Sequence, residues 1–429
     1  MANRLEQLRC SDAGVAVELA QTHGDVIVPL ANGEPDTVLQ ALDAAGAGFT
    51  GVRIHQMHAL RDRKYLHGDF PGLTLNAYFL SSITRKAYAE GGCDFTPAHF
   101  SEVPHILRHV TDNPVVFAAA TPPDRHGWFS LGTNADYVAS FIGKAPFFLE
   151  TNPNMPRTRG ENNIHISQIA GWTEADYPLF EPEPPEVSEK DKVIGALIAE
   201  RIPDGATLQI GIGSIPEALL HHLHGHTDLG VHTELFSDGL AELFEAGVVT
   251  GTKKLTRPGK MVATFALGTR KLYDFIDQNA ALEFLAVNWV NNPRIIGREE
   301  KFVSVNATCE VDVFGQANSE MIDGRLWSGS GGQADFAHGA MFSPHGQGFL
   351  ALHSTTTDES TSRIKVRLDV GAMVTTLKNA VDNVVTEYGV AELHGQPVSV
   401  RARRLIDIAH PKFRDELEAE ARASGYLRG

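Results

Sequence analysis

Strand-like and helical segments alternate along most of this 429-residue chain, and this alternation constrains the fold more than any other feature of the sequence. The strand-like runs, which are short and apolar, cover residues 25–30, 113–118, 145–150, 206–210 and 231–236. The helical patterns cover residues 35–45, 82–90, 192–201 and 216–223. Strands that alternate with helices form βαβ units, so we expect an α/β fold with open, mostly parallel sheets.

The clearest break in this alternation is the segment 180–190, FEPEPPEVSEK. Its prolines and glutamates remove both strand and helix patterning. The chain is also about three times as long as a typical single domain. We therefore predict two α/β domains, at residues 1–180 and 191–429, joined by a linker at residues 181–190.

The formal net charge of −16 argues against nucleic acid or an anionic membrane as a partner, because dense Lys/Arg patches hold such partners. A small anionic ligand remains compatible, since it needs only a few backbone N–H groups or cations. Cys10, Cys93 and Cys309 show no Cys-x-x-Cys spacing, and no signal-peptide core or apolar run of roughly 18 residues is present. We expect a cytoplasmic protein that neither spans nor binds a membrane.

A glycine-containing loop follows the predicted strand at 206–210. Gly211 and Gly213 let the backbone approach a ligand closely, and Ser214 and Glu217 have the spacing of a helix capping box. Free amides at this helix start form a small anion site. A dinucleotide fingerprint would need glycine where Pro216 stands, and a plain tight turn explains the two glycines equally well.

A carboxylate, Glu234, stands at the end of the next predicted strand and precedes a Ser-Asp-Gly turn. Consecutive strands of a βαβ unit usually lie side by side, so Glu234 is expected to face the same crevice as the glycine loop. From spacing alone, a helix cap or a surface ion pair is the favoured interpretation of Glu234.

Two further elements are candidate oxyanion donors. The run 326–336, LWSGSGGQADF, contains Gly331 and Gly332, and such glycines can line up amide donors or form a flexible turn. Asn306 can add a side-chain donor or cap a turn.

Other chemistries lack their sequence signatures. Four histidines, at positions 221, 222, 224 and 226, are spaced too closely at a predicted helix end for a typical metal site, and we expect a solvated tip there. The sequence has no His-Glu-x-x-His motif, no Gly-x-Ser-x-Gly elbow and no phosphate-binding loop of the P-loop type. We expect no metal.

Taken in order, the motifs of both halves resemble the acetyl-CoA hydrolase/transferase family, most closely the 4-hydroxybutyrate CoA-transferases. In the first half these motifs are Gly33-Glu-Pro35, Arg85-Lys-Ala87, Asp94-Phe-Thr-Pro97, Pro122-Pro-Asp124, His126-Gly127, Asn154-Met-Pro156 and Ile164-His-Ile-Ser167. In the second half they are Gly211-Ile-Gly-Ser-Ile215, His232 to Gly239, Gly259 to Thr264, Ser328 to Gln333, Ser362-Arg363 and Thr386-Glu-Tyr-Gly389.

The resemblance implies roles for individual residues. Glu234 matches the catalytic glutamate of the family, and Asn306 and Gly331 match donors to the thioester oxygen. The implied coenzyme A contacts are Gly211, Ile212, Gly213, Ser214, Ile215, Gly331 and Gly332. The resemblance also implies an active site between two α/β domains, a homo-oligomer such as a dimer, and coenzyme A as substrate with no metal or redox cofactor. The segment 355–361, TTTDEST, departs from the family pattern and leaves the rim of the acyl pocket undefined.

The resemblance implies an acyl-CoA:carboxylate CoA-transferase that works by ping-pong kinetics through a glutamyl-CoA thioester. Acetyl-CoA and a short-chain carboxylate such as 4-hydroxybutyrate or butyrate are the expected substrates. Three alternatives remain open: an acyl-CoA hydrolase that uses the same glutamate, a transferase for a dicarboxylate such as itaconate or succinate, and a non-catalytic CoA-binding regulatory protein.

Overall fold

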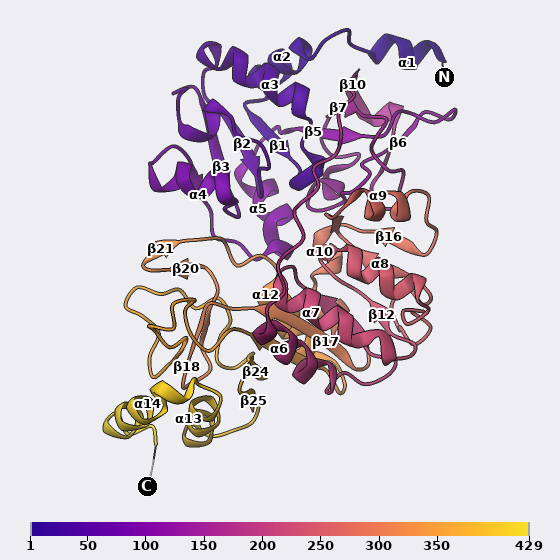
Figure 1. The fold of residues 1–429 in the computed structure, drawn as a ribbon. Coiled ribbons are helices and arrows are strands. Elements are labelled where there is room, and N and C mark those ends of the chain that lie inside the picture. The colour runs from indigo at the N-terminus through magenta and orange to yellow at the C-terminus, as the bar shows by residue number, and fades with distance from the viewer. Residues whose placement is uncertain (1, 428–429) are drawn as a thin grey trace. The chain divides into compact units, whose positions relative to one another are not determined.

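The computed structural model describes residues 2–427, and the chain forms two compact units (Figure 1). The first unit comprises the chain up to residue 182 together with 236–238 and 262–290. The second comprises residues 183–235, 239–261 and 291 onward. The chain thus returns to the first unit after entering the second, whereas the predicted domains are two continuous stretches. The first boundary lies inside the predicted linker, and residues 175–188 form neither helix nor strand.

The first unit is built on a seven-stranded sheet in which every pairing is parallel. In spatial order its strands are β10 (Ile169–Glu174), β7 (Phe147–Thr151), β5 (Val115–Ala120), β1 (Asp25–Val28), β2 (Val52–Gln56), β3 (Leu73–Ala77) and β4 (Asp94–Phe95). β5 has the sequence VVFAAA and is buried at every position, as expected for a parallel strand covered on both faces.

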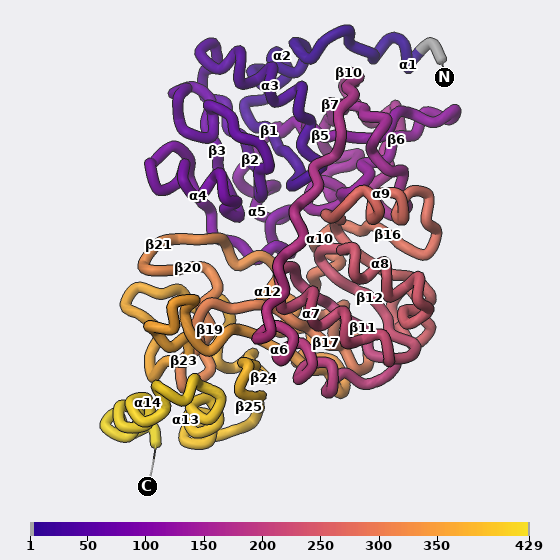
Figure 2. Tube along the Cα trace, viewed as in Figure 1, coloured from indigo at the N-terminus to yellow at the C-terminus, as the bar shows by residue number. Residues whose placement is uncertain are grey.

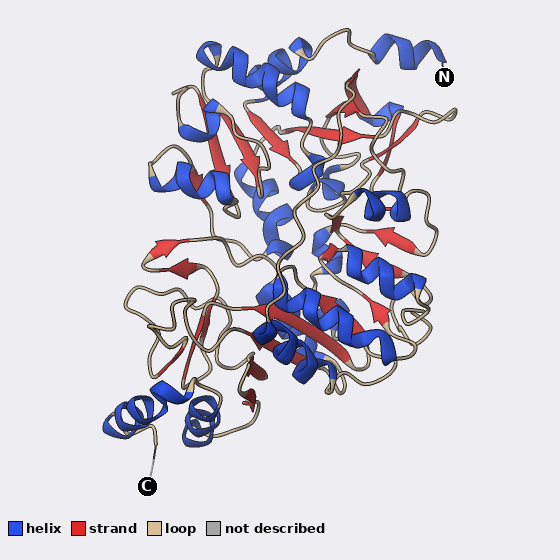
Figure 3. Cartoon of the chain, in the orientation of Figure 1, coloured by secondary structure: helices blue, strands red, loops and turns tan. Residues whose placement is uncertain are grey.

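The helices of the first unit are among those drawn in blue in Figure 3. They are α1 (Ala2–Leu8), α2 (Gly14–His23), α3 (Asp36–Ala45), α4 (Ser82–Ala89), α5 (Val103–Val110), α9 (Arg270–Ile276) and α10 (Val287–Val290). Its short strands outside the main sheet include β6 (Trp128–Ser130), β8 (Arg159–Gly160), β9 (Asn163–His165) and β16 (Leu282–Phe284). Ser81 caps α4 with its side chain, which accepts a hydrogen bond from the Thr84 amide.

The second unit contains a six-stranded sheet. In spatial order its strands are β12 (Gly230–Val231), β11 (Thr207–Ile210), β17 (Phe302–Ala307), β22 (Gln347–Ala351), β24 (Asn383–Thr386) and β25 (Gly389–Glu392). The first five strands run parallel, and β25 is antiparallel to β24. The strand order reverses direction between β11 and β17, which makes the carboxyl ends of these two strands the topological switch point where ligands usually bind.

Helices of the second unit are α6 (Glu189–Ala199), α7 (Ser214–His222), α8 (Asp238–Glu245, which starts at a unit boundary), α11 (Pro293–Ile296), α12 (Gln333–Phe342), α13 (Val398–Asp407) and α14 (Pro411–Ala423). The short strands β18 (Glu310–Asp312), β19 (Ala317–Asn318), β20 (Met321–Ile322), β21 (Arg325–Leu326) and β23 (Ile364–Lys365) lie between β17 and β24 in the sequence (Figure 2). Helices α13 and α14 share one apolar core with β18, β23 and β24, in which Val311, Ile364 and Leu405 are fully buried.

The predicted α/β class with open, mostly parallel sheets is confirmed. The expected strands at 25–30, 113–118, 145–150 and 206–210 correspond to β1, β5, β7 and β11, and the expected helices to α3, α4, α6 and α7, with ends shifted by a few residues. The strand expected at 231–236 is instead two short strands, β12 and β13 (Leu235–Phe236), with Glu234 in the loop between them.

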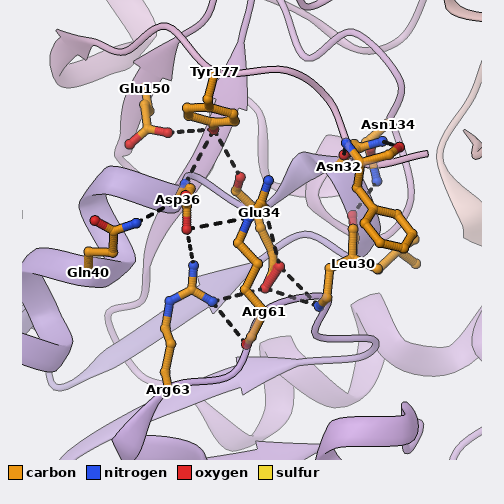
Figure 4. Close-up of polar contacts among 12 residues, drawn as sticks. Leu30, Asn32, Glu34, Asp36, Gln40, Arg61, Arg63, Asn134, Glu150 and Tyr177 are labelled. Atoms are coloured by element: carbon orange, nitrogen blue, oxygen red, sulfur yellow. Dashed lines mark hydrogen bonds and ion pairs between the residues drawn. The ribbon is translucent and has the colours of Figure 1, made fainter. Parts of the chain in front are cut away.

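A buried ion-pair cluster stabilises the Gly33-Glu-Pro35 loop of the first unit (Figure 4). The Glu34 side chain is fully buried, accepts hydrogen bonds from the Leu60 amide at 3.1 and 3.3 Å, and contacts the Arg63 guanidinium at 3.4 Å. Arg63 also contacts Asp36 at 2.7 Å. Burial raises the pKa of Glu34, while Arg63 acts in the opposite direction and favours its charged form.

We predict that R63M lowers the free energy of unfolding by about 3 kcal/mol, because it leaves the buried Glu34 carboxylate with only the longer contact to Arg61 at 3.8 Å. Urea unfolding monitored by circular dichroism checks this. R9M is the matched control, since Arg9 pairs with Glu174 at the surface and such pairs contribute about 1 kcal/mol or less. Equal losses in the two variants would show that the buried ion pair contributes no more to the free energy of unfolding than the surface pair does.

Candidate active site

Glu234 lies at the carboxyl edge of the sheet of the second unit. The preceding residues follow the edge of β11: the His232 amide donates to the Leu208 carbonyl at 3.0 Å, and the Thr233 hydroxyl donates to the Ile210 carbonyl at 3.4 Å. Ile210 is the residue before the glycine loop. The backbone that leads to Glu234 is therefore paired with the end of β11, the strand that precedes the glycine loop.

Two neighbours hold the Glu234 carboxylate. The Asn291 side-chain amide donates to Glu234 Oε2 at 2.8 Å, and the backbone amide of Gly332 also donates to the carboxylate. Asn291 is completely buried. A Cβ on Gly332 would overlap both Glu234 Oε2 and Asn291 Nδ2, so only glycine fits at this point.

The environment of Glu234 favours its protonated form. Burial, as the largest cause, raises the pKa of Glu234 to about 7, and the negative charge of Asp335 in the first turn of α12 raises it further. The hydrogen bonds from Asn291 and Gly332 act in the opposite direction. A carboxylate whose pKa lies near neutrality and whose anion has two donors is suited to nucleophilic or acid–base work.

The glycine loop lies at the switch point between β11 and β17. The Gly211 amide donates to the Val305 carbonyl of β17 at 3.1 Å, and Gly213 has φ of +121°, a conformation that favours glycine. The helix α7 begins directly after Gly213, and its N-terminus has no side-chain cap. The amides of its first turn are therefore available to an anion.

The predicted capping box of Ser214 and Glu217 is wrong. The N-cap residue is Gly213, and the Ser214 hydroxyl donates to Asp191 Oδ1 at 3.0 Å. Asp191 is buried and also accepts hydrogen bonds from His353 at 2.8 Å and from the Ser188 hydroxyl at 2.5 Å. The Ser214 side chain, which the spacing assigned to the helix cap, thus makes a tertiary hydrogen bond to Asp191 instead.

Asn306 lies in β17 with its side chain directed at β11. Its Nδ2 donates to Gln209 Oε1 at 3.2 Å and to Ser304 Oγ at 3.0 Å, and its Oδ1 accepts from Gln209 Nε2 at 3.2 Å. Both N–H groups of the Asn306 amide are therefore engaged within the sheet. A role as oxyanion donor requires one of these two bonds to open.

The glycine-rich run leads into α12, which starts at Gln333. Gly331 is in the left-handed region with φ of +54°, whereas Gly332 has φ of −97° and contacts Glu234 and Asn291. The predicted donor position, Gly331, is thus next to the glycine that faces the carboxylate in this structure.

Sequence reasoning missed Asn291, Asp191 and Asp335. A weak signal for Asn291 existed, because it stands before Asn292-Pro293, a typical start of a helix, and Asn292 caps α11. Nothing local indicates that Asn291 reaches residue 234, since the contact joins positions 57 apart in the chain.

The histidines of the α7 tip do not gather around a common point in residues 2–427. His221, His222 and His224 are exposed, and no group of three or more His, Cys, Asp or Glu side chains in the described chain is placed to hold a metal ion. No helix within those residues is both long and apolar enough to cross a membrane.

Both halves of the chain match domains of one known protein family. Residues 18–188 match the acetyl-CoA hydrolase/transferase N-terminal domain, and residues 268–421 match the C-terminal domain of the same family. The chain belongs to the acetyl-CoA hydrolase/transferase family. The resemblance inferred from the ordered motifs is confirmed.

Relatives within the acetyl-CoA hydrolase/transferase family extend over nearly the whole chain. The 4-hydroxybutyrate coenzyme A transferase of Clostridium kluyveri is 42% identical and aligns over 94% of this chain and 95% of its own. The succinyl-CoA:cyclohexane-1-carboxylate CoA transferase of Geobacter metallireducens is 42% identical over 92% and 90%. The crystal structure of RipA from Yersinia pestis is 30% identical, with a TM-score of 0.94 over 99% of each chain. The prediction of an enzyme of the CoA-transferase class is confirmed.

We predict that G332A lowers turnover by about 100-fold, because its methyl group displaces the Glu234 carboxylate and the Asn291 amide from each other. Steady-state assay of CoA transfer checks this. G348A is the matched control: it adds the same methyl group in β22, where the nearest atom, Asp382 Cβ, is at 3.8 Å. Near-normal turnover of G332A would mean that this contact is not needed for the reaction.

A second prediction concerns stability. The pKa of Glu234 in the folded protein, about 7, lies above its ordinary value of 4.5, so its contribution to stability is present at low pH and is lost as the pH rises toward 7. E234Q removes this dependence. We expect the stability of E234Q relative to the parent protein to increase by about 1–3 kcal/mol between pH 5 and pH 8.

Urea unfolding of both proteins at the two pH values measures this difference, and E183Q, at an exposed glutamate of the same unit, is the control. A difference between E234Q and the parent that does not change with pH would contradict the raised pKa of Glu234.

Proposed function

We propose that this protein is an acyl-CoA:carboxylate CoA-transferase that forms a covalent glutamyl-CoA thioester on Glu234. The observation that carries the proposal is the Glu234 carboxylate, which has a raised pKa and is held by Asn291 and Gly332. It follows β12, and the neighbouring strand β11 leads into the uncapped start of α7 at the switch point of the sheet. A carboxylate in this setting is suited to nucleophilic attack, and an uncapped helix start is suited to binding an anion.

The proposed reaction has two covalent stages and no net proton change. A Glu234 oxygen attacks the acyl carbonyl, and the C–S bond breaks with its electron pair leaving on the CoA sulfur, which gives an acyl-glutamyl anhydride and CoA thiolate. The thiolate then attacks the glutamyl carbonyl, and the first carboxylate leaves. A second carboxylate reverses these steps and returns free Glu234, so we expect ping-pong kinetics.

A free carboxylate is a weak nucleophile toward a thioester, and covalent catalysis replaces this one difficult step by two easier ones. Keeping the thiolate beside the anhydride makes its attack effectively intramolecular, which lowers the activation barrier by ~7–11 kcal/mol in favourable cases. The Gly211 to Ile215 loop, with Gly331 and Gly332, is proposed to bind coenzyme A, and the Gly331 amide is proposed to face the thioester oxygen. Asn306 joins them as a donor if its bond to Gln209 or Ser304 opens.

We propose acetyl-CoA and a short-chain carboxylate such as 4-hydroxybutyrate or butyrate as the exchanging pair, and a homodimer as the assembly. The Clostridium kluyveri relative carries 4-hydroxybutyrate in its name and aligns over nearly the whole chain. A panel of carboxylates assayed against acetyl-CoA, with itaconate and succinate included, distinguishes this acyl class from the dicarboxylates. A no-acceptor reaction in the same panel measures hydrolysis, the second activity in the family's name.

We predict that incubation with acyl-CoA alone leaves CoA attached to Glu234, because no acceptor discharges the thioester. Hydride reduction followed by peptide mass spectrometry marks the modified residue. E234Q should form no adduct and lose activity by more than about 10³-fold, and E234D should lose about 100-fold, since it withdraws the carboxylate by roughly 1 Å.

The same peptide map covers the other candidate carboxylates, Glu34, Asp238 and Glu310. An adduct on one of these residues, with E234Q still active, would overturn the assignment. CoA binding without any adduct or turnover in the parent protein would favour the non-catalytic CoA-binding function.

A further inference from the structure

The glycine loop leads into a helix whose own sequence allows a cap that the structure does not form. Ser214 and Glu217 have the spacing of a capping box, in which the hydroxyl accepts the Glu217 amide and the glutamate side chain accepts the Ser214 amide. In the structure the Glu217 amide donates instead to the Gly213 carbonyl at 3.1 Å, and no side chain among the described residues caps α7. The Ser214 amide therefore has no acceptor within its own helix. We call this arrangement the open form of the helix start.

Asp191 of α6 binds the side chain on which the capping box depends. Its Oδ1 accepts hydrogen bonds from the Ser214 hydroxyl at 3.0 Å and from His353 Nε2 at 2.8 Å. Its Oδ2 accepts from the Ser188 hydroxyl at 2.5 Å and from the Ser188 amide at 2.8 Å. Asp191 is buried, so these donors, which lie on both sides of the carboxylate, fix its orientation.

The charge of Asp191 strengthens its hydrogen bond to Ser214. Burial acts to raise the pKa of Asp191, but the hydrogen bonds to its two oxygens outweigh burial and hold the pKa below its ordinary value. The side chain is therefore charged at neutral pH. Hydrogen bonds to a charged acceptor are roughly twice as strong as those between neutral groups, so the contact with Asp191 is stronger than the neutral cap that Ser214 would otherwise form.

Helix packing keeps Asp191 and Ser214 opposite each other. The helices α6 and α7 lie side by side (Figure 1), and a Cβ on Gly195 of α6 would overlap the backbone of Ala218 and Leu219 in α7. Asp191 and Ser214 each stand four residues, about one helical turn, before this close contact. The distance between the two side chains is thereby set by the packing of the helix backbones.

From these contacts we infer that Asp191 is a positioning residue for coenzyme binding: it holds the Ser214 hydroxyl and so prevents the capping box that would close the start of α7. The inference rests on the proposed function, in which the glycine loop binds coenzyme A. In the capping box the Glu217 carboxylate occupies the Ser214 amide, and its negative charge opposes the phosphate groups and the thiolate of coenzyme A. Asp191 therefore favours the open form, in which this amide is accessible to the coenzyme.

Direct electrostatics predicts the opposite effect of removing Asp191. Deletion of a negative charge next to an anion site strengthens the binding of an anion. If Asp191 favours the open form, its removal lets the capping box form in most molecules, and the apparent affinity for CoA falls in proportion to the fraction that stays open. The sign of the change in affinity therefore distinguishes the two effects.

The test measures the Kd of CoA by isothermal titration calorimetry for D191A and S188A. We expect D191A to bind CoA about 5- to 10-fold more weakly, because a cap of ordinary strength closes the helix start in most molecules. S188A is the matched control: it removes another hydrogen bond to Asp191 together with the cap of α6, and it leaves the bond to Ser214 in place. Its Kd should stay within about 2-fold of the parent value, since the open fraction is unchanged.

A second substitution separates the capping box from general damage. E217A removes the carboxylate that completes the box, and it should change the Kd of the parent protein by less than about 2-fold, because the box is not formed there. In the D191A background, E217A should recover at least about 3-fold of the lost affinity, since the Ser214 amide is no longer occupied. Steady-state assays should show the same pattern in KM for acyl-CoA, with a change in kcat of less than about 3-fold.

Equal or tighter binding of CoA by D191A would overturn the inference. A loss of the same size in S188A, or a loss in D191A that E217A does not reduce, would overturn it as well. If D191A does not fold, D191N decides. Its neutral amide oxygen is a weaker acceptor for the Ser214 hydroxyl, so we expect CoA binding about 3-fold weaker than in the parent protein. Unchanged or tighter binding by D191N would then contradict the role of Asp191.

CoA binding and the Glu234 adduct together distinguish this inference from the proposed function. If the parent protein forms the adduct and D191A binds CoA as tightly as the parent does, the role of Asp191 is refuted and the proposed function stands. If the parent protein neither binds CoA nor forms the adduct, the proposed function fails, and the inference fails with it. Weaker binding in D191A that E217A recovers, with an adduct in the parent protein, supports both.

Discussion

The contact among Glu234, Asn291 and Gly332 is the interaction on which the candidate site depends. It places a partly buried carboxylate against one side-chain amide and one glycine backbone, with no space for a Cβ. Burial keeps the pKa of this carboxylate near 7, and the two donors limit how far it rises. A group that is costly to bury in its charged form thereby changes its protonation state near neutral pH.

The fold of the second unit supplies each part of this contact from a different element. Glu234 follows the end of β12, and the glycine loop follows the end of β11. The two donors, Asn291 and Gly332, directly precede α11 and α12. Parallel strands make this possible, because all their carboxyl ends lie on the same edge of the sheet. Asp191 then links the first residue of α7 to His353 after β22, so the loop and the sheet edge are connected by a buried carboxylate.

The sequence pattern predicted those features of the fold that depend on residues close together in the chain. The apolar runs of β1, β5, β7 and β11 and the alternating helices gave the α/β class, because periodicity and burial coincide in such segments. The Gly211 loop and Glu234 stay predicted site residues, and both were selected because they follow predicted strands. The capping box at Ser214 failed, since Asp191 from another helix competes for the hydroxyl. The return of residues 262–290 to the first unit and the contact of Asn291 with Glu234 depend on long-range packing, which spacing does not encode.

The central claim is that Glu234 carries coenzyme A during the reaction. A crystal structure of the protein reacted with acyl-CoA in the absence of acceptor tests it most directly. We expect continuous electron density from the Glu234 Cδ to the CoA sulfur, with Asn291 within hydrogen-bonding distance of the glutamyl oxygen. Bound CoA whose sulfur lies away from Glu234, or density joining it to another carboxylate, would contradict the account.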